Sequence, residues 1–236
     1  MNIHKIYAPV LKMFRTGRMK RFVERFAITG QTTVLDMGGG AFNWTLLPVR
    51  PKVTILDVYD HGNKAGWATY VVGDGCHTDF PDAAFDVVFS NSVIEHVGGI
   101  DRQRQFAAEC VRCGRGFFVQ TPNKWFPVDT HTLMPFAHWL PQKAFRKLIR
   151  LSPRFVFFKT DPGDLADFSN MRLLSAQDLK ELFPGAEILK ERFCGITKSL
   201  IAVSAAPSPG RQSAGAPAQT ACDNALADKG KNPRPR

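Results

Sequence analysis

The sequence predicts an α/β fold, namely a doubly wound and mostly parallel sheet that ends in an antiparallel hairpin. Short apolar or β-branched runs recur along the chain, and most of them end in an acidic residue or a glycine. Segments with helical spacing separate these runs, as crossovers between parallel strands require. The last two runs, residues 186–193 and 199–203, follow each other after a short connection, which is typical of a hairpin.

Residues 1–28 form the first segment and precede a domain that we expect at residues 29–205. Apolar side chains recur there at helical intervals among basic residues, which predicts one or two amphipathic helices. Two interpretations remain open. The helical segment covers the sheet edge or roofs the ligand cleft, or its basic face rests on anionic lipid.

The first strand runs directly into a glycine loop. Val34 and Leu35 suit a strand covered on both faces, and the acidic Asp36 comes near its end. Residues 43–47 suit the start of a helix whose unpaired N–H groups point back at the loop. Glycines let the backbone turn sharply and approach a ligand where a Cβ would clash. Three follow in succession: Gly38, Gly39 and Gly40.

The loop differs from the dinucleotide-binding fingerprint G-x-G-x-x-G, because Asn43 occupies the position of its third glycine. Asp36 also lies where the negative charge of a pyrophosphate is unfavourable. An acidic residue before the glycines favours a cationic ligand instead. The alternative is an ordinary strand-turn-helix corner without a ligand, since glycine loops recur across α/β folds.

The pattern Asp36-x-Gly38-x-Gly40 resembles motif I of class I S-adenosylmethionine-dependent methyltransferases, in their small-molecule, type 11/12-like branch. The cofactor of that family carries a sulfonium and an amino group. The resemblance implies a Rossmann-like sheet of seven strands with a lid insertion after the fifth. The usual pattern has another glycine where this chain has Phe42. If Phe42 packs beneath the loop rather than facing the ligand, the cofactor interpretation holds without that glycine.

Two further runs end in acidic residues. Asp57 follows a β-branched run and lies 21 residues after Asp36, near the spacing at which α/β folds place a carboxylate on ribose hydroxyls. Asp60 is the alternative ribose ligand, and a solvated loop aspartate is the alternative without a ligand. The resemblance assigns Asp74, in the turn after the third run, to the adenine amino group, with Gly75 beside it.

Residues 80–97, FPDAAFDVVFSNSVIEHV, resemble the fourth strand of the family and the turn that follows it. The resemblance adds Asn91, at the end of this strand, to the cofactor-binding residues. A helix at residues 101–113, a fifth strand at 115–120 and a helix at 173–183 follow in order. Ser175 and Asp178 have the spacing of a capping box at the start of that last helix.

A long segment rich in proline, tryptophan and histidine follows the fifth strand, and we expect it to form a lid insertion at about residues 121–165. Trp125 and Phe126 are the substrate-binding candidates within it. The basic residues of 142–159 suit an anionic substrate, a membrane surface or a solvated helix face.

Methyl transfer to a hydroxyl or a protonated amine needs a base, and histidine titrates near neutral pH. His96 follows the fourth strand, and His131 lies in the insertion. We hypothesise that one of them is the base; the alternative for each is a structural histidine.

Composition restricts the other functions. The net charge of +10 is located at the two ends, with +6 in residues 1–28 and +3 in residues 206–236, so a nucleic-acid groove across the core is not required.

Five scattered cysteines and the lack of a signal-peptide pattern predict a cytoplasmic protein, and peripheral contact at the inner face of the membrane is compatible with this location. The lone C-x-x-C pair predicts no metal site. Residues 206–236 have the composition of a disordered tail.

The leading hypothesis is a methyltransferase that uses S-adenosyl-L-methionine and acts on a small-molecule, glycan or lipid-linked acceptor, with peripheral membrane contact through its basic amphipathic segments. Two alternatives stay open. One is an RNA methyltransferase whose basic ends hold phosphate. The other is a non-catalytic module that binds the cofactor or associates with a membrane.

Overall fold

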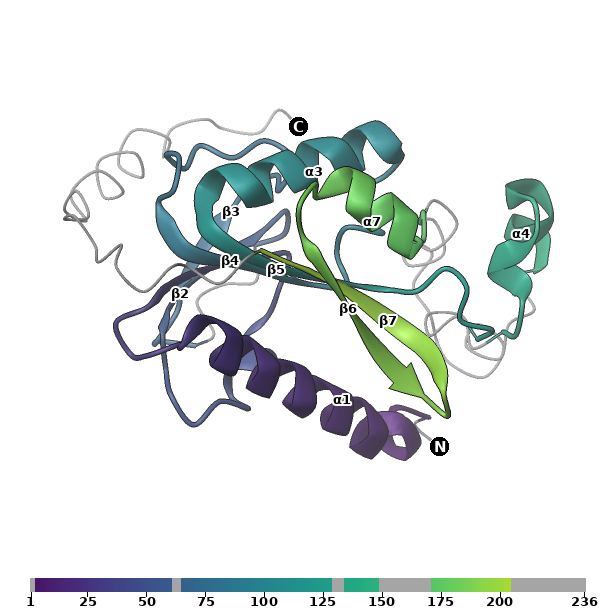
Figure 1. Cartoon of the computed structure of the whole chain (residues 1–236), viewed down its shortest axis with the longest axis horizontal. Coiled ribbons are helices and arrows are strands. Elements are labelled where there is room, and N and C mark those ends of the chain that lie inside the picture. Colours follow the sequence, from purple (N-terminus) through teal and green to yellow (C-terminus); the bar gives the residue numbers. More distant parts are fainter. Residues whose placement is uncertain (1–2, 61–64, 129–133, 149–170, 205–236) are drawn as a thin grey trace, which may run out of the picture. The chain divides into compact units, whose positions relative to one another are not determined.

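In the part of the chain that the structure, a computed structural model, describes, seven strands form a single mixed sheet (Figure 1). The strands are β1 (Thr33–Met37), β2 (Lys52–Asp57), β3 (Thr69–Val72), β4 (Phe85–Asn91), β5 (Gly114–Pro122), β6 (Glu187–Phe193) and β7 (Ile196–Val203). Their order is β3-β2-β1-β4-β5-β7-β6. Neighbours from β3 to β5 are parallel, whereas β7 is antiparallel to β5 and β6. The predicted mostly parallel sheet with a closing hairpin is confirmed.

The structure describes residues 3–60, 65–128, 134–148 and 171–204, with helical residues 3–11, 142 and 146 described by their backbone alone. The predicted tail at 206–236, and parts of the predicted insertion, lie outside these ranges. The described helices are α1 (Ile3–Phe26), α2 (Ala41–Trp44), α3 (Ile100–Cys113), the 3-10 helix η1 (Ala137–Trp139), α4 (Gln142–Leu148) and α7 (Ala176–Leu182).

One face of the sheet is covered by α1. Met19, Phe22 and Phe26 of this helix are buried in a cluster with inward side chains of β1, β2, β4, β5 and β7. The Phe22 ring meets the rings of Phe89 and Phe118 edge to face at 5.1 and 5.5 Å. The helix therefore covers a face of the sheet rather than its edge, and its apolar half belongs to the core.

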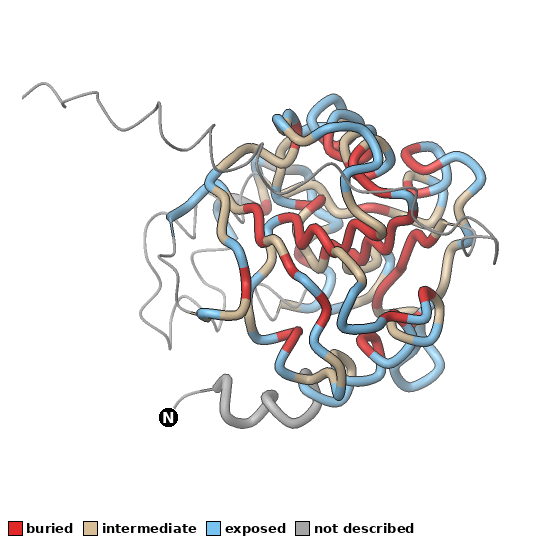
Figure 2. Tube along the Cα trace, turned by 90° about the vertical axis from the view of Figure 1, so that its left-hand side faces the viewer, coloured by how far each residue is buried: buried red, intermediate tan, exposed pale blue. Residues whose placement is uncertain are grey.

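The opposite face is covered by α3 and α7 (Figure 1). Strand β1 shows how the two faces alternate, because Leu35 and Met37 belong to the cluster on the α3 side and Val34 belongs to the cluster on the α1 side. Figure 2 shows the buried residues concentrated along the strands between these layers. The central strands are thus buried on both faces, as parallel strands of an α/β fold require.

Several local predictions can be compared with the structure. The expected capping box is present: Ser175 Oγ accepts a hydrogen bond from Asp178 N, and Asp178 Oδ2 accepts one from Ser175 N at 2.8 Å. The helix expected at residues 43–47 is wrong in its bounds, because α2 is a single turn that begins at Ala41 and ends at Trp44. Of the predicted N-terminal segment, described residues 3–28 contain one helix, α1.

Candidate functional site

The carboxyl ends of β1, β2 and β4 lie side by side at one edge of the sheet. Strand β1 pairs with β2 on one side and with β4 on the other. From β1 the chain adds β2 and β3 toward one edge of the sheet and then returns to add β4 and β5 on the other side, so the strand order reverses between β1 and β4. Open α/β sheets bind ligands where the strand order reverses. The structure brings together at this edge the predicted residues that terminate the strands or follow them: Asp36, Asp57, Asp74 and Asn91.

Asp36 is fully buried beneath the glycine loop. Its Oδ2 accepts a hydrogen bond from Trp44 Nε1 at 2.7 Å, whereas its Oδ1 has no hydrogen-bond partner among the described residues. Burial raises the pKa of Asp36 to about 7, the Trp44 hydrogen bond opposes this rise, and the charge of Asp57 adds to it. The carboxyl group is therefore half protonated near neutral pH, and a nearby cation would favour its ionised form.

The glycine loop is packed too tightly for side chains at two of its three glycines. Gly38 has φ +70°, and a Cβ there would lie 2.5 Å from Val93 Cγ1. A Cβ at Gly39 would overlap the Asp36 carboxylate. Gly40 has open space around the Cβ position and an extended backbone with φ −145°. Gly38 and Gly39 are thus required by the protein's own packing, and Gly40 leaves room above the loop.

The condition set for Phe42, packing beneath the loop, is not met. Its ring does not pack beneath the loop, because 48% of the residue is exposed and the Arg15 guanidinium lies 5.4 Å from the ring centroid. The short helix α2 directs Trp44 toward the core and leaves Phe42 on the surface. The residue in place of the usual glycine therefore contacts α1 instead of supporting the loop.

Asp57 and Asp74 follow the neighbouring strands. Asp57 ends β2, and its Oδ1 accepts a hydrogen bond from Tyr59 N at 3.0 Å, while the alternative Asp60 is exposed beyond it. Both carboxylate oxygens of Asp74 accept from Arg102 Nη2, at 2.9 and 2.8 Å. Burial raises the pKa of Asp74, but the Cys76 N–H and the Arg102 guanidinium outweigh it and hold the pKa below its usual range.

Gly75 is close to α3, since a Cβ there would lie 2.9 Å from Phe106 Cε2. The loop after β3 is therefore fixed from two sides. Arg102 holds the carboxylate of Asp74, and Phe106 limits the residue that follows it.

Asn91, at the end of β4, is bound by a buried arginine of α1. Arg18 Nη1 donates to Asn91 Oδ1, and the same guanidinium donates to both oxygens of Glu191 on β6, at 3.1 and 2.6 Å. Arg18 and Glu191 are 5% and 4% exposed, so this is a desolvated ion pair rather than a surface one. It joins α1 to the strand end next to the glycine loop.

His96 is exposed just after β4, and a buried carboxylate lies next to it. The His96 Nε2 is 4.0 Å from Glu95 Oε1, and Glu95 itself is 0% exposed. Glu95 Oε2 accepts from the Thr121 hydroxyl at 2.9 Å, which ties the turn to β5. A carboxylate behind a histidine can orient the ring and favour its protonated form. The other candidate base, His131, lies outside the described residues.

Trp125 and Phe126 follow β5. Trp125 is 60% exposed, and Phe126 is partly buried in a turn closed by its N–H to the Asn123 carbonyl at 2.9 Å. The Trp125 ring is 6.2 Å from that of Trp139, which in turn is 5.1 Å from that of Phe136. These three exposed rings, Trp125, Phe136 and Trp139, form an aromatic cluster.

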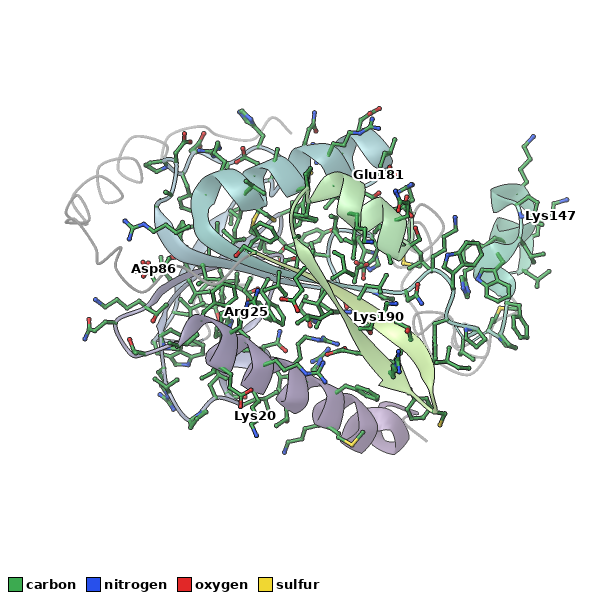
Figure 3. The ribbon with its side chains drawn as sticks, in the orientation of Figure 1. Lys20, Arg25, Asp86, Lys147, Glu181 and Lys190 are labelled. Atoms are coloured by element: carbon green, nitrogen blue, oxygen red, sulfur yellow. The ribbon has the colours of Figure 1, made fainter. Side chains whose placement is uncertain are left out.

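Basic side chains accompany the aromatic cluster. Lys124 Nζ lies 5.3 Å from the centroid of the Trp125 ring. Lys143 and Lys147 of α4 are exposed, and Figure 3 labels Lys147 on this helix. Trp139 Nε1 donates to the Lys124 carbonyl at 2.7 Å, so the beginning and the middle of the segment are connected. Lys124 thus places a positive charge beside the exposed rings.

The cysteines and the histidines offer no metal site in the described residues, where no group of three or more His, Cys, Asp or Glu side chains could hold an ion. Burial raises the pKa of Cys110 and of Cys113, the C-x-x-C pair, and both are thiols without a disulfide. Cys110 Sγ packs 3.6 Å from Met37 Sδ. Among the described helices, none has the length and apolar character to span a bilayer.

Sequence reasoning missed the partners that hold the predicted residues. Trp44 lies within the glycine-loop stretch, and its indole next to an acidic strand end was a usable signal. Arg102 contacts a carboxylate 28 residues away, and Arg18 contacts residues 73 and 173 positions away. Separations of this size leave no pattern in a single sequence.

The comparisons with known proteins agree with this geometry. A family model described as a methyltransferase domain matches residues 35–116. No curated protein matches the chain in sequence at a significant level.

Two solved structures illustrate the structural similarity. Magnesium protoporphyrin IX methyltransferase from Synechocystis PCC 6803, with bound SAH, superposes with a TM-score of 0.53 at 13% identity, over 86% of this chain and 88% of that one. The Burkholderia thailandensis 1,6-didemethyltoxoflavin-N1-methyltransferase, with bound 1,6-didemethyltoxoflavin and S-adenosylhomocysteine, superposes with a TM-score of 0.50 at 14% identity, over 80% of this chain and 75% of that one. At these identities the similarity establishes the fold. The family match assigns residues 35–116 of this fold to a methyltransferase domain.

Proposed function

We propose that the chain binds S-adenosyl-L-methionine at the carboxyl edge of β1 to β4 and transfers its methyl group to a small-molecule, glycan or lipid-linked acceptor. Residues 29–205 would form the catalytic domain, with residues 1–28 as a segment that covers it. The observation that carries the proposal is the glycine loop over a buried acid, followed by carboxylates after the next two strands.

The residues present fit the cofactor. Asp36 has a buried oxygen without a partner among the described residues. Because its pKa is about 7, the carboxyl can lose its proton near neutral pH, and an amino group above the loop then gains a counter-charge there. The carboxylate acts through the loop, since Gly39 lies directly against it. We therefore assign Asp36 to positioning the loop and to electrostatic attraction, and Gly38, Gly39 and Gly40 to backbone contact.

The two other carboxylates suit the nucleoside. Asp57 ends a strand next to β1, where a carboxylate can accept from two vicinal ribose hydroxyls. Asp74 can accept from the adenine amino group if it shares or exchanges its Arg102 contact. That ion pair is half exposed, so opening it costs at most about 1 kcal/mol. Gly75 and Asn91 complete the predicted set.

When bound, the cofactor supplies a methyl group on a sulfonium that is transferred by in-line displacement. The protein holds the acceptor in line and removes its proton where one is present. His96 is suited to accept that proton, because it is exposed next to the strand edge and Glu95 can stabilise the protonated ring. His131 remains a second proposed base in the insertion.

The acceptor side is proposed to involve the aromatic cluster. Trp125 and its neighbours expose apolar rings, and Lys124 lies beside the Trp125 ring, which suits an acceptor with an apolar body and an acidic or hydroxylated end. The same surface would allow peripheral contact with a membrane when the acceptor is lipid-linked.

A radiolabel transfer assay tests the proposal. The full chain is incubated with S-adenosylmethionine labelled in its methyl group and with fractionated cell extract. We expect label in a small-molecule, glycan or organic-solvent fraction. Label that stays with RNA and falls steeply with salt would contradict the acceptor class, and absence of both transfer and S-adenosylhomocysteine binding would contradict the proposal as a whole.

The role of the base is tested by His96→Gln, with His138→Gln as a matched control. His138 is partly buried and contacts the Lys124 carbonyl at 3.0 Å through Nε2. Loss of a general base lowers turnover by roughly 100-fold or more, while cofactor affinity stays within about twofold. Full activity of a variant that lacks both His96 and His131 would eliminate these residues as the base.

A further inference from the structure

Three cations of α1 and β7 gather next to the glycine loop, and we define Arg15, Arg18 and Lys198 as the cationic cluster. Arg18 is fully engaged, since it donates to Asn91 and to both oxygens of Glu191. Its charge is therefore balanced by one carboxylate. The other two cations have no carboxylate within ion-pair distance among the residues that the structure describes.

Arg15 and Lys198 are each held against an aromatic ring. The Arg15 guanidinium lies 5.4 Å from the centroid of the Phe42 ring, and Lys198 Nζ lies 4.1 Å from the centroid of the Phe14 ring. Both residues are half-buried rather than extended into solvent. Aromatic contacts restrict the two side chains but do not neutralise them.

Their charges are close enough to oppose one another. Burial, and after it the charge of Arg18, lower the pKa of Arg15. Burial lowers the pKa of Lys198 as well, with the charge of Arg18 next, and Glu191 only partly compensates. Partly desolvated like charges are unfavourable unless an anion joins them. The cluster therefore has an excess of positive charge that no described side chain balances.

The position of the cluster connects it to methyl transfer. Phe42, under Arg15, follows the glycine loop by two residues. Arg18 contacts Asn91 at the end of β4, and the Lys198 carbonyl accepts from Asn123 N at 2.9 Å where the segment with the aromatic cluster begins. The cationic cluster thus lies between the proposed cofactor site and the proposed acceptor side.

We propose that Arg15 and Lys198 form a binding site for an anionic group, a carboxylate or a phosphate, of the methyl acceptor. The inference rests on the proposed function and narrows its substrate class to acids. Arg15 offers a planar set of donors and Lys198 a flexible ammonium, a combination that suits either anion. Arg18 fixes α1 to β4 and β6 and so positions Arg15.

The first experiment uses inorganic phosphate as the probe. The full chain, with and without saturating S-adenosylhomocysteine, is titrated with phosphate and with chloride at matched ionic strength, while the side-chain nitrogen signals of Arg15 and Lys198 are followed by NMR. We expect saturable shifts with phosphate alone. Equal shifts with chloride, or no saturation, would overturn the inference, as would phosphate binding that S-adenosylhomocysteine abolishes, since the site would then belong to the cofactor's carboxylate.

Variants separate this site from the cofactor site. Arg15→Gln and Lys198→Gln are each expected to weaken phosphate binding by roughly tenfold and to leave S-adenosylhomocysteine affinity within about twofold. Lys20→Gln is the matched control, because Lys20 lies on the same helix, is 76% exposed and pairs with Glu24 (Figure 3). A similar loss in the control would overturn the inference.

The product of the radiolabel assay provides an independent readout. The labelled product should be retained by an anion-exchange resin at neutral pH and eluted by salt. A neutral or cationic product would overturn the anion site while the methyltransferase proposal stands. Failure to bind S-adenosylhomocysteine would instead reject the proposed function itself.

Discussion

The strand-end site and the proposed acceptor side differ in how far their polar and apolar groups are buried. Beneath the glycine loop, Asp36 is buried and bonded to Trp44, and Gly38 and Gly39 leave no space for side chains. On the acceptor side, Trp125 and Trp139 expose 60% and 44% of their surface. The groups of the strand-end site are thus held by contacts within the protein, whereas the rings of the proposed acceptor side are exposed to solvent.

This difference accounts for the limits of the family match in sequence. The family match covers residues 35–116, which contain the glycine loop and the strands around it. A loop that fits one constant ligand restricts residue types, whereas an acceptor surface changes with its substrate. The two regions should therefore respond differently to substitution.

Gly39→Ala is expected to have the largest effect. Its Cβ would displace the buried Asp36 carboxylate from Trp44, which costs on the order of 3 kcal/mol of unfolding free energy and lowers S-adenosylhomocysteine affinity more than about 100-fold. Chemical denaturation and calorimetric titration measure the two changes. Gly40→Ala is the control, because open space surrounds its Cβ position; equal damage from both variants would show that packing against Asp36 is not the cause.

Asp36→Asn tests the buried acid through pH. The folded state keeps a proton on Asp36 that the unfolded state releases, because the pKa is raised from 3.8 to about 7. The stability associated with this proton is present below about pH 4 and is lost as pH rises to about 7, by up to about 4 kcal/mol. Asp36→Asn should flatten this part of the profile.

The comparison variant for Asp36→Asn is Asp101→Asn, whose side chain is 86% exposed. It should retain the wild-type slope between pH 4 and pH 7 in denaturation experiments. An Asp36→Asn profile as steep as that of the wild type would mean that the carboxyl is ionised throughout, in conflict with its burial.

Asp57→Asn is expected to weaken S-adenosylhomocysteine binding by roughly tenfold, since an amide is a poorer acceptor for two ribose hydroxyls than a carboxylate. The protein's stability should change little, because Asp57 is only partly buried. Asp60→Asn, three residues further on, should bind as the wild type does. If calorimetric titration instead shows weaker binding for Asp60→Asn and unchanged binding for Asp57→Asn, Asp60 would be the ribose ligand.

Trp125→Ala should have the smallest effect. Its ring is mostly exposed, so unfolding free energy should change by less than about 0.5 kcal/mol and cofactor affinity should not change. The acceptor KM should rise several-fold, about 1 kcal/mol, once an acceptor is identified in the transfer assay. A large loss of stability would indicate that the aromatic cluster belongs to the core.

The fold could be predicted from sequence because each core strand carries a local signal. Val34 and Leu35 precede an acid and glycines, Asp57 closes a β-branched run, and the pattern at residues 80–97 includes Glu95 and His96 near its end. The bounds of α2 were less predictable, because a single turn has too few residues to show a helical period.

The details of the site depend on long-range contacts that one sequence does not encode in a readable form. Packing of Phe42 beneath the loop was the condition set from the sequence, but a ring on the surface can stack with Arg15 of a distant helix. Arginine is usually exposed, and Arg18 is buried because it pairs with Glu191, which lies 173 positions later in the sequence. The spacing of residues in the sequence therefore predicted which strand ends carry candidate site residues, but it did not predict which side chains contact those residues.

The most direct test of the strand-end cofactor site is a calorimetric titration of the wild-type chain with S-adenosylhomocysteine. We predict saturable binding of one ligand per chain, accompanied by proton release near pH 7 as the ligand's amino group favours ionised Asp36. No saturation up to about 1 mM ligand would contradict the assignment of the strand ends as a cofactor site.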